Sequence, residues 1–312
     1  MRIIIGLFLL TALYTYGYEP VQPVPKVVEY DRDKAELGKL LFHDPILAKD
    51  NRTSCSYCHD LYQKCGTDHR PVSKGFHDRK GKVNAPTVYN VRFNFRFFWD
   101  GRAKTLKEQI LGPIQSPVEM NMSLKEVEDR LNQHPVYRKK FKEIYGVDRI
   151  TFELVADAII EFEKALITPN SKFDKYLRGE AQLTEDELEG YRLFKKLGCI
   201  SCHNGINLGG NSFQKIGVIK PYPWHPYYPD RYRITGKEFD KNVYRVPTLR
   251  NIDCTYPYFH DGSVKTLEEA VQLMAYYNLG FRLPQDELDK IIAFLKTLRG
   301  ELPEILKSEG KQ

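Results

Sequence analysis

Apolar residues along much of the chain recur every three to four positions, which is the spacing of one helix face. The pattern is clearest over residues 154–166 and again over residues 288–298. A Thr-Pro-Asn-Ser run at 168–171 breaks the periodicity between these stretches. The pattern therefore predicts a mostly α-helical chain, with one domain over residues 19–168 and a second over residues 169–312.

Capping residues mark three helix starts. Ser123, Thr184 and Thr266 are each followed three positions later by a glutamate. A hydroxyl and a carboxylate at this spacing pair reciprocally with the free backbone N–H groups of a first helical turn. One of these helices, over residues 185–196, is expected to lead directly into the cysteines that follow it.

The two domains carry the same sequence plan, displaced by 161 residues. Three pairs of segments share this displacement: 85–90 with 246–251, 98–101 with 259–262, and 105–108 with 266–269. The cysteine motifs lie only 144 residues apart, so the second domain contains additional loop, which we assign to the aromatic and Pro-rich residues 220–233. Matches in this order and spacing indicate an internal duplication.

Four of the six cysteines lie in two copies of a C-x-x-C-H motif, formed by Cys55, Cys58 and His59 and by Cys199, Cys202 and His203. In this motif two thiols form thioethers with the edge of a haem, and the histidine supplies an axial nitrogen to its iron. A C-x-x-C pair alone also occurs in zinc and redox sites, but here a histidine follows both copies. The sequence therefore predicts two covalently bound c-type haems, one in each domain.

The domains differ in the residue available as sixth iron ligand. The helix after Thr266 places Met274 where its thioether can bind the second haem, which raises the reduction potential and closes the iron to small molecules. At the same displacement the first domain has Pro113, which has no ligating atom. The first iron is therefore either bound by another group, with Met120 and Met122 as rival ligands, or open to substrate.

Composition and charge fit an exported globular protein. Hydrophobic residues make up 42% and charged residues 28% of the chain, and the net charge of +6 is spread without a Lys/Arg block, which argues against nucleic-acid binding. The apolar run at residues 3–13 is shorter than the roughly 20 residues of a membrane span. We expect residues 1–18 to be a signal peptide for periplasmic export, or an N-terminal membrane anchor if uncleaved. Cys65 and Cys254 are then left to pair, stay free or be buried.

These motifs together resemble the bacterial di-haem cytochrome c peroxidases, a family related to the di-haem enzyme that matures methylamine dehydrogenase. The resemblance runs from about residue 35 to residue 298. The matching segments are residues 55–59, 84–87, 98–103 with Gln109, 117–120, 199–203, 247–251 and 255–262. It implies two tandem cytochrome c-like domains and a peroxidase activity.

The resemblance also implies a role for individual residues. The haem of His59 is similar to the peroxidatic haem, with Glu119 and Gln109 as its peroxide-handling residues, and the haem of His203, with Met274, to the electron-entry haem. The remaining matches are Trp99 between the haems, Arg245 and His260 around the second haem, and Asn84, Thr255 and Pro257 around one calcium ion.

Many family members close the resting peroxidatic haem with a distal histidine in the loop before residues 84–87. An ungapped alignment of residues 71–87 puts Phe76 at that position, one residue before His77. His77 is therefore the predicted ligand, and His69 is the alternative. If neither binds iron, the first haem is open at rest.

We expect the enzyme to reduce hydrogen peroxide to water with electrons from a small reduced c-type cytochrome, and to form a homodimer as family members do. One alternative is a non-enzymatic di-haem electron carrier. Another is a protein-modifying oxidase, whose members typically have tyrosine in place of Met274. The methionine favours the peroxidase hypothesis.

Overall fold

The computed structural model describes residues 19–307. The predicted signal peptide or anchor at residues 1–18 therefore lies outside the described residues. Within 19–307, no helix is both long enough and apolar enough to cross a membrane.

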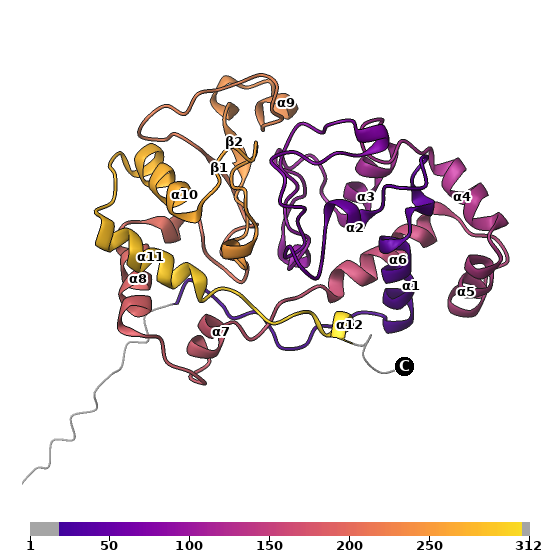
Figure 1. The fold of residues 1–312 in the computed structure, drawn as a ribbon, viewed down its shortest axis with the longest axis horizontal. Coiled ribbons are helices and arrows are strands. Elements are labelled where there is room, and N and C mark those ends of the chain that lie inside the picture. The colour runs from indigo at the N-terminus through magenta and orange to yellow at the C-terminus, as the bar shows by residue number, and fades with distance from the viewer. Residues whose placement is uncertain (1–18, 308–312) are drawn as a thin grey trace, which may run out of the picture.

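The chain is mostly helical, and its elements fall into two groups along the sequence (Figure 1). The α-helices are α1 (Arg32–His43), α2 (Cys55–Cys58), α3 (Leu106–Gln115), α4 (Leu124–Gln133), α5 (Pro135–Tyr145), α6 (Phe152–Ala165), α7 (Lys172–Leu177), α8 (Glu185–Lys196), α9 (Tyr232–Thr235), α10 (Leu267–Met274), α11 (Gln285–Lys296) and α12 (Glu304–Lys307). Short 3-10 turns lie at Pro45–Leu47, Phe76–Asp78, Val91–Phe93, Cys199–Ser201, Glu238–Asp240 and Ile252–Cys254, and a π-helical turn at Ala275–Leu279. The strands β1 (Phe213–Lys215) and β2 (Val243–Arg245) form an antiparallel pair.

The helices predicted from periodicity and capping are confirmed. Helices α6, α8 and α11 cover the expected stretches within a few residues. Ser123 and Thr184 each form both bonds of a capping box, with Glu126 and Glu187. Thr266 accepts a hydrogen bond from the Glu269 backbone N–H and so caps α10. Local side-chain bonds therefore set these helix starts, as the sequence indicates.

A close helix pair forms the centre of each domain: α1 packs on α6, and α8 packs on α11 (Figure 1). Both crossings depend on a glycine. A Cβ atom added to Gly38 would lie 1.9 Å from the Ala158 carbonyl oxygen, and one added to Gly190 would lie 1.9 Å from the Lys290 carbonyl oxygen. Only a residue without a side chain allows these backbones to come so close.

The predicted duplication is visible in the backbone. Asn90 and Asn251, 161 residues apart, both adopt a left-handed conformation with φ of 60°. The isolated bridge between Phe97 and Ala103 is repeated, at the same displacement, between Tyr258 and Val264. The chain is thus two tandem cytochrome c-like domains.

The terminal segments pack on the domain to which they do not belong in sequence. Val21 lies in the hydrophobic core built around α8 and α11, and the Val24 N–H donates to Asp174 at 3.0 Å. Conversely, Ile305 and Leu306 of α12 pack in a core with residues of α1 and α6. Each domain is therefore completed by a terminal segment that belongs in sequence to the other domain. The domain boundary between residues 168 and 169 stays a prediction.

The two domains meet at the hydroxyl of Thr168, which is 2% exposed. The side-chain amides of Asn90 and Asn251, the pair related by the duplication, both donate to this oxygen, at 2.7 and 2.9 Å. The Asn90 side-chain oxygen in turn accepts from the Thr168 backbone N–H at 2.9 Å. One buried hydroxyl therefore links equivalent positions of both domains.

We expect Thr168→Val to lower the free energy of unfolding by about 2–4 kcal/mol, because it leaves two buried amide donors without an acceptor at nearly unchanged volume. Chemical denaturation of the holoprotein would measure the loss. The matched control Thr168→Ser keeps the oxygen and should cost less than about 1.5 kcal/mol. Equal losses in the two variants would contradict a shared hydrogen-bond role for this hydroxyl.

Candidate active site

Both C-x-x-C-H motifs are folded into a single tight turn. In the first, α2 spans the two cysteines and the His59 backbone N–H donates to the Cys55 carbonyl at 2.9 Å. In the second, a 3-10 turn follows Gly198, and the His203 N–H donates to the Cys199 carbonyl at 3.0 Å. This turn brings two thiols and one imidazole together in each domain, as attachment to a single haem requires.

The two imidazoles are oriented by backbone carbonyls. His59 Nδ1 lies 3.0 Å from the Gly66 carbonyl oxygen, and His203 Nδ1 lies 3.2 Å from the Leu208 carbonyl oxygen. A carbonyl only accepts, so Nδ1 carries the proton and Nε2 keeps a free lone pair for a metal. Burial lowers the pKa of both histidines, that of His203 to about 4, which keeps the rings neutral.

Desolvation acts on three of the four motif cysteines. Burial raises the pKa of Cys55 and Cys58 to about 12 and that of Cys199 to about 11, so they are thiols at neutral pH. A redox C-x-x-C pair needs a lowered pKa. Over residues 19–307, no group of three or more His, Cys, Asp or Glu side chains is placed to hold a metal ion.

A buried cation and a buried imidazole of the second domain fit the anionic edge of a haem. The Arg245 guanidinium is 4% exposed, and within residues 19–307 it forms no ion pair; its Nε donates to the Phe98 carbonyl at 3.3 Å. Burial lowers its pKa to about 10. His260 is 3% exposed, and its Nδ1 has no hydrogen-bond partner among the described residues. A haem propionate is an anion, and it would supply the partner that the guanidinium and the imidazole do not have among the described residues.

Met274 is the last residue of α10, where the helix widens into the π-helical turn Ala275–Leu279. Such turns frequently occur at functional sites. Its sulfur lies 3.6 Å from the amide nitrogen of Asn278, whose oxygen accepts from the Gly217 N–H at 2.7 Å. The equivalent helix α3 of the first domain carries Pro113 at the corresponding position, as the sequence indicates.

Glu119 lies beside the first motif. Its charge contributes to the raised pKa of the Cys58 thiol. Desolvation raises the pKa of Glu119 itself, and a hydrogen bond from Ser116 and the charge of Arg102 oppose this only in part. The Glu119 backbone carbonyl accepts from the Phe76 N–H at 2.6 Å, which ties it to the loop that contains His77. Gln109 lies half-buried on the nearby helix α3.

The predicted sixth ligands of the first iron lie in different environments. His77 is exposed, on the Phe76–Asp78 turn, with a left-handed φ of 51°. The His69 ring donates to the Cys254 carbonyl at 2.8 Å and stacks on Tyr256, so it is already engaged. Met120 and Met122 are 3% and 1% exposed within the hydrophobic core of the first domain, which fits core residues rather than ligands.

Trp99 lies at the contact between the domains. Its indole N–H donates to the Asn84 carbonyl at 2.9 Å, and its own carbonyl accepts from the Arg245 N–H at 2.8 Å. Its ring packs edge-on against His260, with centroids 6.4 Å apart. The Asn84 N–H donates to the His260 carbonyl at 2.8 Å. Asn84 is thereby placed next to the loop that carries Thr255 and Pro257.

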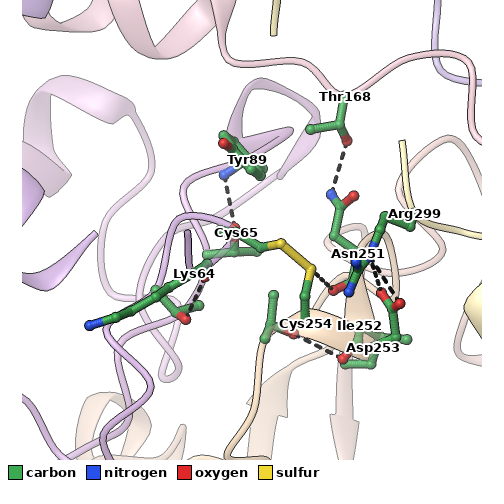
Figure 2. Close-up of a disulfide and its surroundings, with 12 residues drawn as sticks. Lys64, Cys65, Tyr89, Thr168, Asn251, Ile252, Asp253, Cys254 and Arg299 are labelled. Atoms are coloured by element: carbon green, nitrogen blue, oxygen red, sulfur yellow. Dashed lines mark hydrogen bonds and ion pairs between the residues drawn. A yellow bond between two sulfur atoms is a disulfide. The ribbon is translucent and has the colours of Figure 1, made fainter. Parts of the chain in front are cut away.

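The structure also resolves the fate of the two remaining cysteines. Cys65 and Cys254 form a disulfide that joins the two domains across 189 residues of chain (Figure 2). The sequence left this pairing open, although one leftover cysteine in each half of an exported chain is a signal for it. The four motif cysteines are free, as haem attachment requires.

Comparisons with known proteins agree with two haem domains in tandem. A model of the di-haem cytochrome c peroxidase family matches residues 32–182, and a cytochrome c model matches residues 188–299. The cytochrome c551 peroxidase of Nitrosomonas europaea is 50% identical over 287 residues, which cover 92% of this chain and 86% of that protein. The corresponding protein of Pseudomonas aeruginosa is 38% identical, with 94% and 88% covered. The crystal structure of a MauG-like protein associated with microbial copper homeostasis is 30% identical, with a TM-score of 0.79 and 94% and 96% covered.

Proposed function

Because the chain belongs to the di-haem cytochrome c peroxidase family, we propose that it reduces hydrogen peroxide to two waters with electrons from a small reduced c-type cytochrome. It is an oxidoreductase that acts on peroxide and carries two c-type haems. When bound, the haems supply iron atoms that exchange electrons and, in the first domain, take up the peroxide. The donor's identity beyond its chemical class is left open.

The observation that carries this proposal is the difference between two otherwise equivalent domains. The second presents a thioether from Met274, and the first presents Pro113 at the same backbone position with Glu119 beside its motif. A sulfur ligand favours a stable electron store, whereas a free position beside a carboxylate favours chemistry. Met274 also argues against the protein-modifying oxidase, and the unequal domains argue against a simple carrier.

Glu119 is the proposed proton-transferring residue. Its carboxylate takes a proton from one oxygen of peroxide and returns it to the other, so that water can leave, while the Gln109 amide holds the peroxide by hydrogen bonding. A raised pKa suits a group that must both accept and release a proton near neutral pH. Trp99, in contact with both domains, lies on the proposed path for electrons between them.

Access to the first site is proposed to depend on His77. Its imidazole would supply a ligand to the iron at rest and would withdraw on activation, and its exposed position permits such a movement. His69 remains the alternative, although its bond to Cys254 would have to break first. Arg245 and His260 are proposed to hold the propionate groups of the second haem.

Calcium, dimerisation and periplasmic location are further parts of the proposal. The carbonyl oxygens of Thr255 and Pro257 accept no hydrogen bond from the described residues, and Asn84 lies next to their loop. Such oxygens suit a hard cation. The Cys65–Cys254 disulfide suits an oxidising compartment. The homodimer is expected from the family.

We expect Glu119→Gln to lower peroxide turnover by about 100-fold or more while both haems stay attached, because the amide cannot transfer the proton. Steady-state oxidation of a reduced cytochrome c would measure it. In the wild type, turnover should fall on acidification at a higher pH than an ordinary glutamate would give, because the raised pKa protonates the carboxylate earlier. The control Glu153→Gln alters an exposed glutamate of α6 and should keep full activity. Wild-type turnover in Glu119→Gln would remove this residue from the mechanism.

We expect Met274→Leu to lower the reduction potential of the second haem, because a thioether ligand raises it. Potentiometric titration followed by absorbance would separate the two haems. Met122→Leu changes a methionine in the first domain's core and should leave both potentials in place. A second-haem potential that does not respond to loss of Met274 would show that another residue is the ligand.

We expect a calcium chelator to lower turnover and added calcium to restore it. Asn84→Ala should reduce the calcium content of the purified protein below one ion per chain, measured by elemental analysis, because an oxygen ligand is lost. Asn84→Asp keeps that oxygen and adds charge, so it should bind calcium at least as well. Unchanged calcium content in Asn84→Ala would place the ion elsewhere.

A further inference from the structure

The Cys65–Cys254 disulfide joins two loops with different tasks. Cys65 lies in the loop that follows the first haem motif, and Cys254 ends the Ile252–Cys254 turn of the second domain (Figure 2). The Cα atoms of the two cysteines are 6.0 Å apart. Nothing in the proposed chemistry requires this bond, so its position needs a separate explanation.

On the first-domain side, the disulfide holds the group that orients the proximal histidine. Cys65 directly precedes Gly66, whose carbonyl accepts from His59 Nδ1 at 3.0 Å. Cys65 and Gly66 both have left-handed backbones, with φ of 51° and 74°. The Cys65 carbonyl accepts from the Thr87 hydroxyl at 2.6 Å. The Gly66 N–H donates to the Asp60 carbonyl at 2.8 Å, and the Gly66 carbonyl also accepts from the Val88 N–H at 3.3 Å. The Gly66 carbonyl is therefore aimed at His59 by a left-handed two-residue turn, and the disulfide and Thr87 are the ties that hold the Cys65 end of this turn.

On the second-domain side, the disulfide ends in a rigid turn. Cys254 is 7% exposed, and its N–H donates to the Asn251 carbonyl at 3.1 Å. Asn251 is one of the two amides bonded to Thr168, and Figure 2 shows this bond close to the disulfide. Arg299 pairs with Asp253 at 3.0 Å and fixes the same turn from α11's end. The turn is thus a firm anchor.

The second domain has no equivalent of this tie. Its histidine, His203, is oriented by the Leu208 carbonyl, and no cysteine lies between the two. Residue 93, which corresponds to Cys254 in the first domain, is a phenylalanine. The cross-link is therefore specific to the domain proposed to react with peroxide.

We propose that the Cys65–Cys254 disulfide is a positioning element for His59: it fixes the Gly66 carbonyl against the second domain and so sets the strength of the hydrogen bond to the proximal imidazole. This inference rests on His59 as an iron ligand in the proposed function. A stronger bond to Nδ1 makes the imidazole more basic and favours ferric iron. Loss of the tie should weaken that bond and favour the ferrous form of the first haem only.

The test compares the holoprotein with a Cys65→Ser/Cys254→Ser variant that still carries two haems by mass. We expect the equilibrium between ferric and ferrous first haem to shift toward ferrous by on the order of tenfold, the lower end of second-shell effects. The iron–histidine stretching frequency, measured by resonance Raman on the reduced protein, should fall. The second haem should keep its potential.

Lys172→Gln is the matched control, because it removes an ion pair of the second domain, that with Glu187 at 2.8 Å, and leaves the turn that carries Cys254 intact. It should lower the unfolding temperature and leave the first haem's potential in place. Thr87→Val removes the other tie on Cys65, so it should shift the first haem's potential in the same direction as the cysteine variant. When the two changes are combined, the shift should be smaller than the sum of the separate shifts, because both act on the same turn. A cysteine variant that is less stable but keeps the wild-type potential of the first haem and the wild-type stretching frequency would overturn the proposal. The disulfide would then only stabilise the fold.

If the serine variant fails to mature, the bond can be opened after haem attachment. A phosphine reductant gives the disulfide two electrons and, with two protons, yields two thiols, while the phosphine takes an oxygen from water. The thiols are then alkylated, the reductant is removed, and the first haem is titrated against an untreated sample. An unshifted potential in the alkylated protein also overturns the proposal. Failure of the peroxidase function itself would appear separately, as an inactive wild type.

Discussion

The arrangement of this protein depends on one buried hydroxyl shared by two asparagines. Thr168 accepts from the side chains of Asn90 and Asn251, and no water competes, because all three residues are at most 2% exposed. An unpaired amide at either position would cost its full desolvation energy. The two domains are therefore held in register at this point, where a displacement would leave buried amides without an acceptor. Asn90 also accepts from Asn207 through its carbonyl at 3.4 Å, which extends the network to the loop after the second motif.

Local sequence signals predicted most of the fold. Glu126 and Glu187 set helix starts through bonds within four residues, so a reader of the sequence can find them. The haem motifs are equally local, since each orienting turn is only a few residues long. By contrast, the crossing of α12 onto the first domain depends on packing between residues more than 100 positions apart, and periodicity carries no information about it.

The candidate site was predictable in its residues but not in its environment. The sequence named Arg245 and His260, but only the fold shows that the guanidinium is buried without an anionic partner and that Nδ1 is unpaired among residues 19–307. The disulfide illustrates the same limit. Two leftover cysteines allow three outcomes, and only the folded chain shows that their loops lie close enough to form the bond. His77 is likewise exposed on a left-handed turn, and a histidine in the sequence does not by itself predict such a backbone conformation.

Duplication explains why only a few residues distinguish the proposed electron-entry domain from the proposed peroxide-reducing domain. Equivalent residues of the two domains meet at the pseudo-symmetric contact: Asn90 faces Asn251, and Trp99 faces its counterpart His260 across 6.4 Å. A symmetric frame alone would give two identical irons. Pro113 and Met274 occupy equivalent positions of α3 and α10, which begin 161 residues apart with the same threonine cap, so the proposed thioether ligand of the second domain has no counterpart in the first. The Cys65–Cys254 bond breaks the symmetry further, because it ties only the first domain's proximal loop to its neighbour. The proposed difference in function thus rests on a few side chains, while the symmetric contacts hold the two backbones in the same arrangement.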